Sequence, residues 1–128
     1  MTVSAMKRMF LAAAIFNGSL IIAGLAPQFF LGLFRISPLP TEPLFVHLFF
    51  WLVFVFGIAY YWIARDPAGN LPLIRLGIIG KLGVVAVCLA DVSLGIVSWQ
   101  LMILASVDLA FAMLFWKALK VLRSGLSG

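Results

Sequence analysis

Charged residues, cysteine and histidine are all scarce in this sequence. Only 10% of its 128 residues are charged, whereas a soluble domain needs about a quarter to cover its surface. The single cysteine, Cys88, excludes a disulfide within the chain. The single histidine, His47, excludes a haem held between two histidines and leaves a His47–Met102 haem as an alternative that we do not favour. The shortage of charge predicts that most of the surface faces lipid.

Hydrophobic residues make up 65% of the chain and gather in four runs. A helix that crosses a bilayer needs about 20 apolar residues, and we expect such spans at residues 9–26, 44–64, 71–91 and 99–116. These spans and their short connections leave no room for a soluble domain. The sequence therefore predicts an all-α fold, with one membrane domain (residues 1–128) that is a bundle of four antiparallel transmembrane helices.

The connection between the first two spans, residues 27–43, contains Pro27, Pro38, Pro40 and Pro43. Proline lacks the backbone N–H and clashes with the preceding turn, so no continuous helix is expected. The stretch Phe29–Phe34 is nevertheless strongly apolar, which predicts a segment that lies along the membrane interface or re-enters the membrane.

The turn at residues 65–70 precedes the third span. Here Asn70 is expected to cap the following helix, and Pro72 is tolerated in its first turn. Nearby Tyr60, Tyr61 and Trp62, and Trp51 closer to the other end of the second span, are expected to form aromatic belts at the membrane interfaces.

Basic residues are distributed unevenly over the two sides of the predicted bundle. The side with both termini and the turn at residues 65–70 carries Lys7, Arg8, Arg65, Arg75, Lys117, Lys120 and Arg123. The other side carries Arg35 with Glu42 and Asp91. Cytoplasmic segments of membrane proteins are rich in Lys and Arg, so we expect both termini in the cytoplasm and the protein in a bacterial-type inner membrane. The net charge of +5 forms no stripe or arm and does not indicate nucleic-acid binding.

Three polar residues are predicted to lie at the same depth inside the bundle. Lys81 lies ten residues beyond Leu71, and Asn17 lies ten residues beyond Lys7, which places both roughly 15 Å deep at 1.5 Å per residue. Asp108 lies nine residues before Lys117, or roughly 13–14 Å deep. We therefore expect Lys81 and Asp108 to pair, with Asn17 close by. The pair is either structural, fixing which helices pack together, or active, as a relay for protons or ions or a site for a polar headgroup.

Small residues surround both members of this pair. Gly77, Gly80 and Gly83 thin one side of the third span, so a neighbouring backbone is expected to approach beside Lys81. Ala105 and Ala112 lie about one turn from Asp108 on the same face, which predicts a face that packs on another helix.

A second polar group is predicted near the outer face of the bundle. His47 lies one turn into the second span, with Glu42 before it and Asp91 at the end of the third span. A metal site made from these three residues is one hypothesis. The other is that His47 is simply a polar residue at the interface.

Three strings resemble, in their order and spacing, a group of small, uncharacterised bacterial four-span membrane proteins: Ala64-Arg65-Asp66-Pro67, Gly77 with Gly80-Lys81, and Asp108 to Phe115. The resemblance covers about Ile58 to Leu119. That group has no established activity, so the resemblance implies only that Lys81 and Asp108 are the main candidates for functional residues. DoxX-like four-helix membrane proteins, some linked to quinol oxidation, are similar in span number and in a Gly-Lys pair.

These features favour a small membrane protein that is an accessory or structural subunit, packed on lipid, on a larger membrane complex or on itself. The alternative is a small oligomeric transporter or channel that uses the Lys81–Asp108 pair. An enzyme is not expected, because the sequence has no metal-ligand cluster, no nucleophile with a base at useful spacing and no phosphate-binding loop. For the same reason we expect no cofactor and no metal.

Overall fold

The described part of the protein, in a computed structural model, is helical throughout and contains no strand. The structure describes residues 1–127, and the side chains of residues 1–125; Gly128 lies outside the described residues. The helices are α1 (Val3–Leu25), α2 (Pro27–Leu33), α3 (Pro43–Arg65), the short 3-10 helix η1 (Ala68–Asn70), α4 (Leu71–Ser93) and α5 (Leu101–Ser127). Within the described residues, α1, α3, α4 and α5 are long and apolar enough to cross a membrane. The predicted all-helical fold with four long apolar helices is thus confirmed.

The ends of two long helices differ from the predicted spans. Helix α1 begins at Val3 instead of residue 9, and Thr2 caps it, because its hydroxyl oxygen accepts a hydrogen bond from the backbone N–H of Ala5 at 3.1 Å. Helix α5 continues to Ser127 instead of ending at Trp116. Nothing stops it earlier, since residues 117–123 contain neither proline nor glycine.

The first connection contains a helix that was not predicted. Helix α2 starts at Pro27, a position where proline is tolerated because the first N–H groups of a helix have no partner in any case. It ends at Leu33, shortly before Arg35 adopts a left-handed conformation with φ 57°. The prolines therefore limit the length of helix in this connection, but they do not exclude it.

Asn70 occupies the N-cap position of α4 as predicted, but its side chain does not cap the helix, since it makes no capping hydrogen bond to α4. Instead, its Nδ2 donates to the carbonyl oxygens of Trp62 at 3.3 Å and Asp66 at 2.8 Å. Asn70 thus binds carbonyl groups at the end of α3, where the Trp62 carbonyl also accepts a hydrogen bond from the backbone N–H of Asp66 at 3.2 Å. Pro72 does lie in the first turn of α4, as expected.

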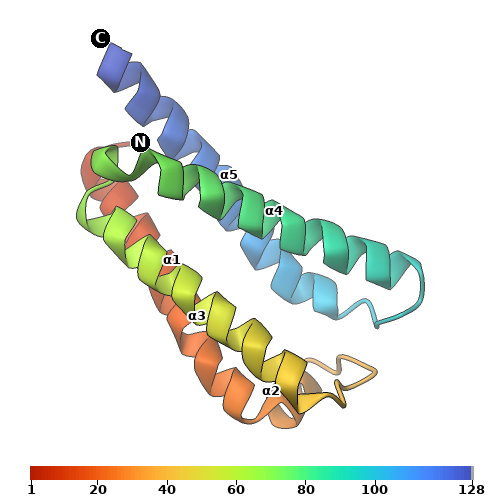
Figure 1. Cartoon of the computed structure of the whole chain (residues 1–128). Helices are drawn as coiled ribbons and strands as arrows, with labels where there is room; N and C mark the ends of the chain where they lie inside the picture. Colours follow the sequence, from red (N-terminus) through yellow and green to blue (C-terminus); the bar gives the residue numbers. More distant parts are fainter. Residues whose placement is uncertain (128) are drawn as a thin grey trace.

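The long helices form two pairs, α1 with α3 and α4 with α5 (Figure 1). The pairs meet at the end where both termini and η1 lie, and they splay apart toward the other end. There, the segments at residues 34–42 and 94–100 connect them again. The backbone N–H of Ser98 donates to the carbonyl of Ser37 at 2.7 Å, and the N–H of Ser37 donates to the Ser98 hydroxyl at 2.9 Å. We call these two hydrogen bonds the serine clasp.

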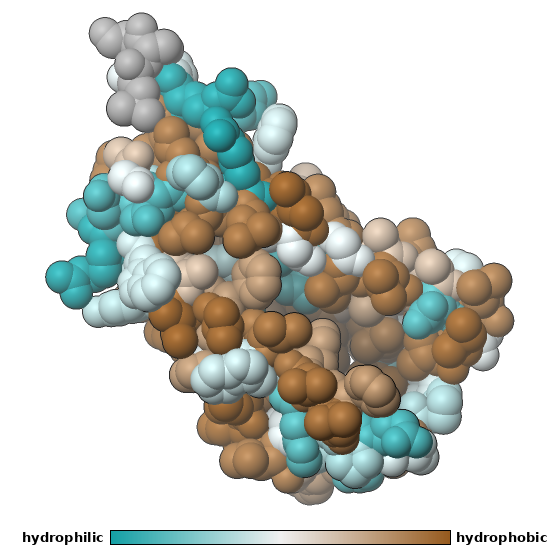
Figure 2. All heavy atoms as spheres, in the orientation of Figure 1, coloured by the Kyte–Doolittle hydropathy of each residue, from teal (hydrophilic) through white to brown (hydrophobic). Residues whose placement is uncertain are grey.

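The hydrophobic core lies at the end where the two pairs meet. Its buried residues come from all four long helices: Met6, Phe10, Ala13, Tyr60, Ile63, Ala64, Ile74, Ile78, Phe115, Ala118, Leu119 and Leu122. Tyr60 is 2% exposed, so its assignment to an interfacial belt is wrong, whereas Trp51, Tyr61 and Trp62 are exposed. Figure 2 shows apolar side chains over most of the visible surface, with hydrophilic ones most numerous near the termini and smaller groups at the opposite end.

Two glycines allow α1 and α3 to pack closely. A Cβ atom on Gly57 would lie 3.2 Å from Cβ of Asn17 and 3.2 Å from the backbone nitrogen of Gly18. A Cβ atom on Gly24 would lie 2.8 Å from Cβ of Phe50. The α1–α3 contact therefore depends on the absence of a side chain at these positions.

Replacing Gly57 by leucine should push α1 away from α3, because the new side chain meets backbone atoms that cannot move individually. We expect Gly57→Leu to lower the free energy of unfolding by about 1–3 kcal/mol. Gly83→Leu is the matched control, since no atom lies within 4 Å of a Cβ at that position. Unfolding of the purified protein in detergent, followed by circular dichroism, measures both. Equal losses in the two variants would contradict this close contact.

Candidate functional site

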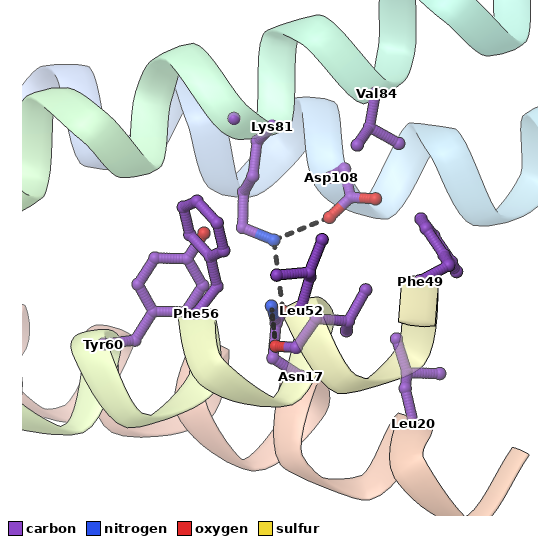
Figure 3. Close-up of a pocket in the computed structure, with 11 residues that line it drawn as sticks. Asn17, Leu20, Phe49, Leu52, Phe56, Tyr60, Lys81, Val84 and Asp108 are labelled. Carbon is purple, nitrogen blue, oxygen red and sulfur yellow. Dashed lines mark hydrogen bonds and ion pairs between the residues drawn. The ribbon is translucent and has the colours of Figure 1, made fainter. Parts of the chain in front are cut away.

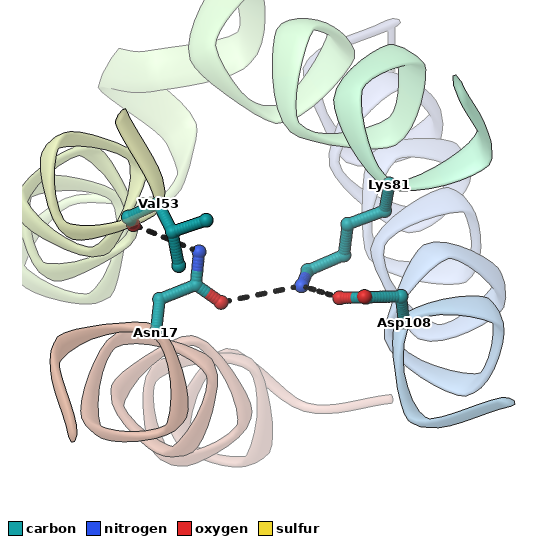
Figure 4. A network of polar contacts seen from close by, with 4 residues as sticks. All are labelled: Asn17, Val53, Lys81 and Asp108. Carbon is teal, nitrogen blue, oxygen red and sulfur yellow. Dashed lines mark hydrogen bonds and ion pairs between the residues drawn. The ribbon is translucent and has the colours of Figure 1, made fainter. Parts of the chain in front are cut away.

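Each of the four long helices contributes one group to a polar network between the two helix pairs (Figure 4). The Lys81 ammonium on α4 donates to Oδ1 of Asp108 on α5 at 2.6 Å and to Oδ1 of Asn17 on α1 at 3.4 Å. The Nδ2 of Asn17 donates to the carbonyl oxygen of Val53 on α3 at 3.1 Å. The three polar residues that were predicted at one depth therefore meet in one network.

The close packing of α1 on α3 positions Asn17 for this role. Because Gly57 has no side chain, α1 approaches α3 until the Asn17 amide reaches the Val53 carbonyl. A carbonyl oxygen has two lone pairs, so it can accept this bond in addition to the one within its helix. With its Nδ2 held in this way, Asn17 presents its own oxygen to Lys81.

Aromatic rings surround the rest of the Lys81 head. The ammonium nitrogen lies 5.2 Å from the ring centroids of Tyr60 and Phe111 and 5.7 Å from that of Phe16. A cation within about 6 Å of a ring face is attracted by the ring quadrupole. Lys81 is 3% exposed, so a carboxylate, an amide oxygen and three rings replace its hydration shell.

Small residues were predicted to let other helices approach on both sides of the ion pair. The prediction is confirmed for the alanines of α5 but not for the glycines of α4. Ala105 and Ala112 are each 2% exposed, as expected for a face that packs on other helices. Gly77 and Gly80 lie against the rings of Tyr60 and Phe56 respectively, and not against a neighbouring backbone. Nothing lies within 4 Å of a Cβ at Gly83, so this third glycine is not a site of close approach.

Asp108 is less buried than Lys81, because it borders a cavity. Its side chain is 21% exposed, against 4% for that of Lys81. The cavity has a volume of about 230 Å³ and is lined by Asn17, Leu20, Phe49, Leu52, Val53, Phe56, Tyr60, Gly80, Lys81, Val84 and Asp108. In Figure 3 one carboxylate oxygen of Asp108 faces Lys81, and the other points away, toward the side on which Val84 and Phe49 lie. The walls are therefore apolar and the polar groups are concentrated at one place.

A second cavity, of about 460 Å³, lies near the serine clasp. It is lined by residues of α2, the following loop, α3, the connection at residues 94–100 and the start of α5, among them Ile36, Glu42, Phe45 and Val97. Phe49 lines both cavities. The two spaces therefore adjoin at this aromatic side chain.

The residues of the predicted outer-face site do not form a metal centre. Among the described residues, no group of three or more His, Cys, Asp or Glu side chains is placed to hold a metal ion. Glu42 precedes α3 and His47 lies near its start, both exposed, whereas Asp91 lies in α4 on the other helix pair. Helices α3 and α4 belong to pairs that splay apart at this end (Figure 1), in agreement with the absence of such a group from the described part of the chain.

The seven basic residues of the predicted cytoplasmic flank are all exposed: Lys7, Arg8, Arg65, Arg75, Lys117, Lys120 and Arg123. They belong to the ends of the long helices at which the two pairs meet. Arg65 also donates to the hydroxyl of Tyr61 at 3.1 Å. The charge asymmetry predicted along the chain is therefore also an asymmetry between the two ends of the molecule.

Sequence reasoning missed the aromatic part of the site. Phe111 lies one turn after Asp108 on α5, and Phe56 and Tyr60 are one turn apart on α3. That spacing places side chains on one helix face. On α5, where Asp108 identified the inward face, it could have predicted that Phe111 belongs to the site. On α3 no charged residue marks the inward face, so Tyr60 was misplaced.

Comparisons with protein-family models, with curated proteins and with solved structures find no match for this chain. The resemblance to a group of bacterial four-span membrane proteins therefore stays a prediction.

Removing one member of the ion pair should cost much more stability than removing both. Lys81→Met leaves a buried carboxylate unpaired and Asp108→Leu leaves a buried ammonium unpaired, so we expect each to lower the free energy of unfolding by about 3–5 kcal/mol. The double variant leaves no charge behind and should lose far less. The free energies of unfolding of the wild type, the two single variants and the double variant, all measured in detergent, form a double-mutant cycle. Additive losses would show that the two charges are not coupled.

Proposed function

We propose that this chain is a multi-pass integral membrane protein with α1, α3, α4 and α5 crossing the bilayer in alternating directions. The length and apolar character of these helices support it, as do the exposed apolar side chains along them. The exposed basic residues at one end support cytoplasmic termini, by the preference of Lys and Arg for the cytoplasmic side. On this proposal the membrane is a bacterial-type inner membrane, and the serine clasp lies on its outer side.

Two exposed positions test this orientation. Both variants are made in a Cys88→Ala background. Thr41→Cys places a thiol in the loop between α2 and α3, at the end with the serine clasp. Ala68→Cys places one in the turn between α3 and α4. A membrane-impermeant maleimide should label Thr41→Cys in intact cells and Ala68→Cys only after the membrane is disrupted. The reverse pattern would contradict cytoplasmic termini.

We further propose that the cavity beside Asp108 is a ligand-binding site within the membrane, as a small carrier or transporter requires. The observation that carries this proposal is the unequal burial of the pair, with the Lys81 side chain 4% and the Asp108 side chain 21% exposed. A pair that serves only to hold helices together gains nothing from a carboxylate that borders an apolar cavity. Ionisable residues at membrane depth are functional candidates by default.

The proposal predicts that the protein retains a small molecule through a mild-detergent purification, and that the Lys81→Met/Asp108→Leu double variant loses it while remaining folded. The matched control is Leu82→Met with Leu109→Met, at exposed neighbouring positions of the same two helices. Native mass spectrometry compares the three proteins. Retention that is equal in all three, or absent in the wild type, would contradict a binding site at the pair.

An accessory subunit is the second candidate, and the surface of α3 favours it. Several large aromatic residues along α3 are exposed, including Phe45, Trp51 and Trp62, although Phe50 and Tyr60 are buried. Such a face suits a neighbouring membrane helix as well as lipid. In the same purification, a larger membrane protein in fixed stoichiometry would support the subunit hypothesis, and recovery of the chain alone or with itself would contradict it.

A further inference from the structure

We propose that the cavity beside Asp108 binds the hydroxyl end of an uncharged lipophilic alcohol that reaches it from the bilayer. This inference rests on the binding role proposed above and names the ligand class of that site. It follows from the hydrogen-bonding capacity that the network leaves unused, from the charges that surround the cavity and from the nature of its walls.

Two polar groups at the cavity have no described hydrogen-bond partner: the second carboxylate oxygen of Asp108, and the hydroxyl of Tyr60, which can donate or accept. Lys81 donates to Asp108 and Asn17, and its head is otherwise surrounded by rings. The Asn17 amide nitrogen donates to the Val53 carbonyl. No described residue donates to the second carboxylate oxygen of Asp108, which points away from Lys81 (Figure 3). A carboxylate oxygen can only accept a hydrogen bond, so a complementary ligand must donate one.

The charges around the cavity favour a neutral donor. A carboxylate or phosphate group on the ligand would face the Asp108 carboxylate. A cationic group would share that carboxylate with the Lys81 ammonium, which already lies 2.6 Å from it. Repulsion between like charges is strong where little water screens it. A hydroxyl group avoids both contacts and still donates to the carboxylate.

The walls and the size of the cavity indicate that the rest of the ligand is apolar. Leu20, Phe49, Leu52 and Phe56 form much of the lining. The volume of about 230 Å³ is below the roughly 300–1,000 Å³ of pockets that enclose a drug-sized ligand. The cavity therefore has room for the polar end of a lipophilic molecule but not for the whole of it. Since Phe49 also lines the cavity of about 460 Å³, the apolar remainder has space beyond this side chain.

The test uses the full-length protein in liposomes and a long-chain primary alcohol with a photoreactive diazirine on its alkyl chain. After irradiation, peptide mass spectrometry should locate adducts on cavity residues of α3, and the unlabelled alcohol should prevent them. The methyl ether, the carboxylate and the trimethylammonium analogue of the same chain length should compete roughly tenfold less well, because a hydrogen bond to a charged group contributes at least that factor.

Two substitutions on α4 connect the adducts to the cavity without altering the ion pair. Val84→Phe fills the cavity, so it should abolish the adducts. Val87→Phe adds the same volume at an exposed position three residues away and should leave them unchanged. The proposal is overturned if adducts persist in Val84→Phe, or if the ether or either charged analogue competes as well as the alcohol.

The outcomes also separate this inference from the proposed function on which it rests. If the wild type retains a different class of molecule, and the Lys81→Met/Asp108→Leu variant loses it, the ligand class is wrong and the binding site stands. If no molecule is retained and none of the probes gives adducts in the cavity, both proposals fail.

Discussion

A buried ammonium ion has to be neutralised at the place where it lies, and Lys81 imposes this requirement on every long helix of the protein. Asp108 supplies the opposite charge at 2.6 Å, Asn17 supplies an amide oxygen, and Val53 holds that amide through its carbonyl. Since these groups come from α5, α1 and α3, the network links the two helix pairs at a depth where apolar packing alone leaves a cavity. The buried charge of Lys81, which is unfavourable on its own, thus sets the relative position of the helices.

The hydrophobic core and the polar network divide this task between them. At the end with the termini, the ring of Phe115 lies 4.6 Å from that of Phe10 and 5.1 Å from that of Tyr60, centroid to centroid, and these contacts hold the pairs together. Beyond the network no comparable cluster of buried side chains joins the pairs among the described residues, and the serine clasp connects them only through loops. The cavities therefore lie in the part of the bundle that is held together by polar contacts.

The meeting of Lys81 with Asp108 could be predicted because each is the only charged residue near the middle of its apolar run, and counting from the ends placed both at one depth. The α1–α3 contact could not, because Gly57 and Gly24 matter only through the residues they face across the pair. Helix α2 was missed because its proline lies at a helix start, where it does not disrupt the helix. The cavity could not be predicted at all, since it results from how far the two pairs diverge.

For a chain that crosses a membrane as proposed, the pairing of helices bears on how it assembles there. Lys81 and Asp108 lie on α4 and α5, which are packed together and joined only by residues 94–100, whereas Asn17 belongs to the other pair. If the helices enter the bilayer as hairpins, the cation and its counter-ion enter in the same hairpin. Neither charge is then unpaired in lipid before the N-terminal half arrives. The amide of Asn17 is needed only for the later docking of two units whose buried charges already cancel.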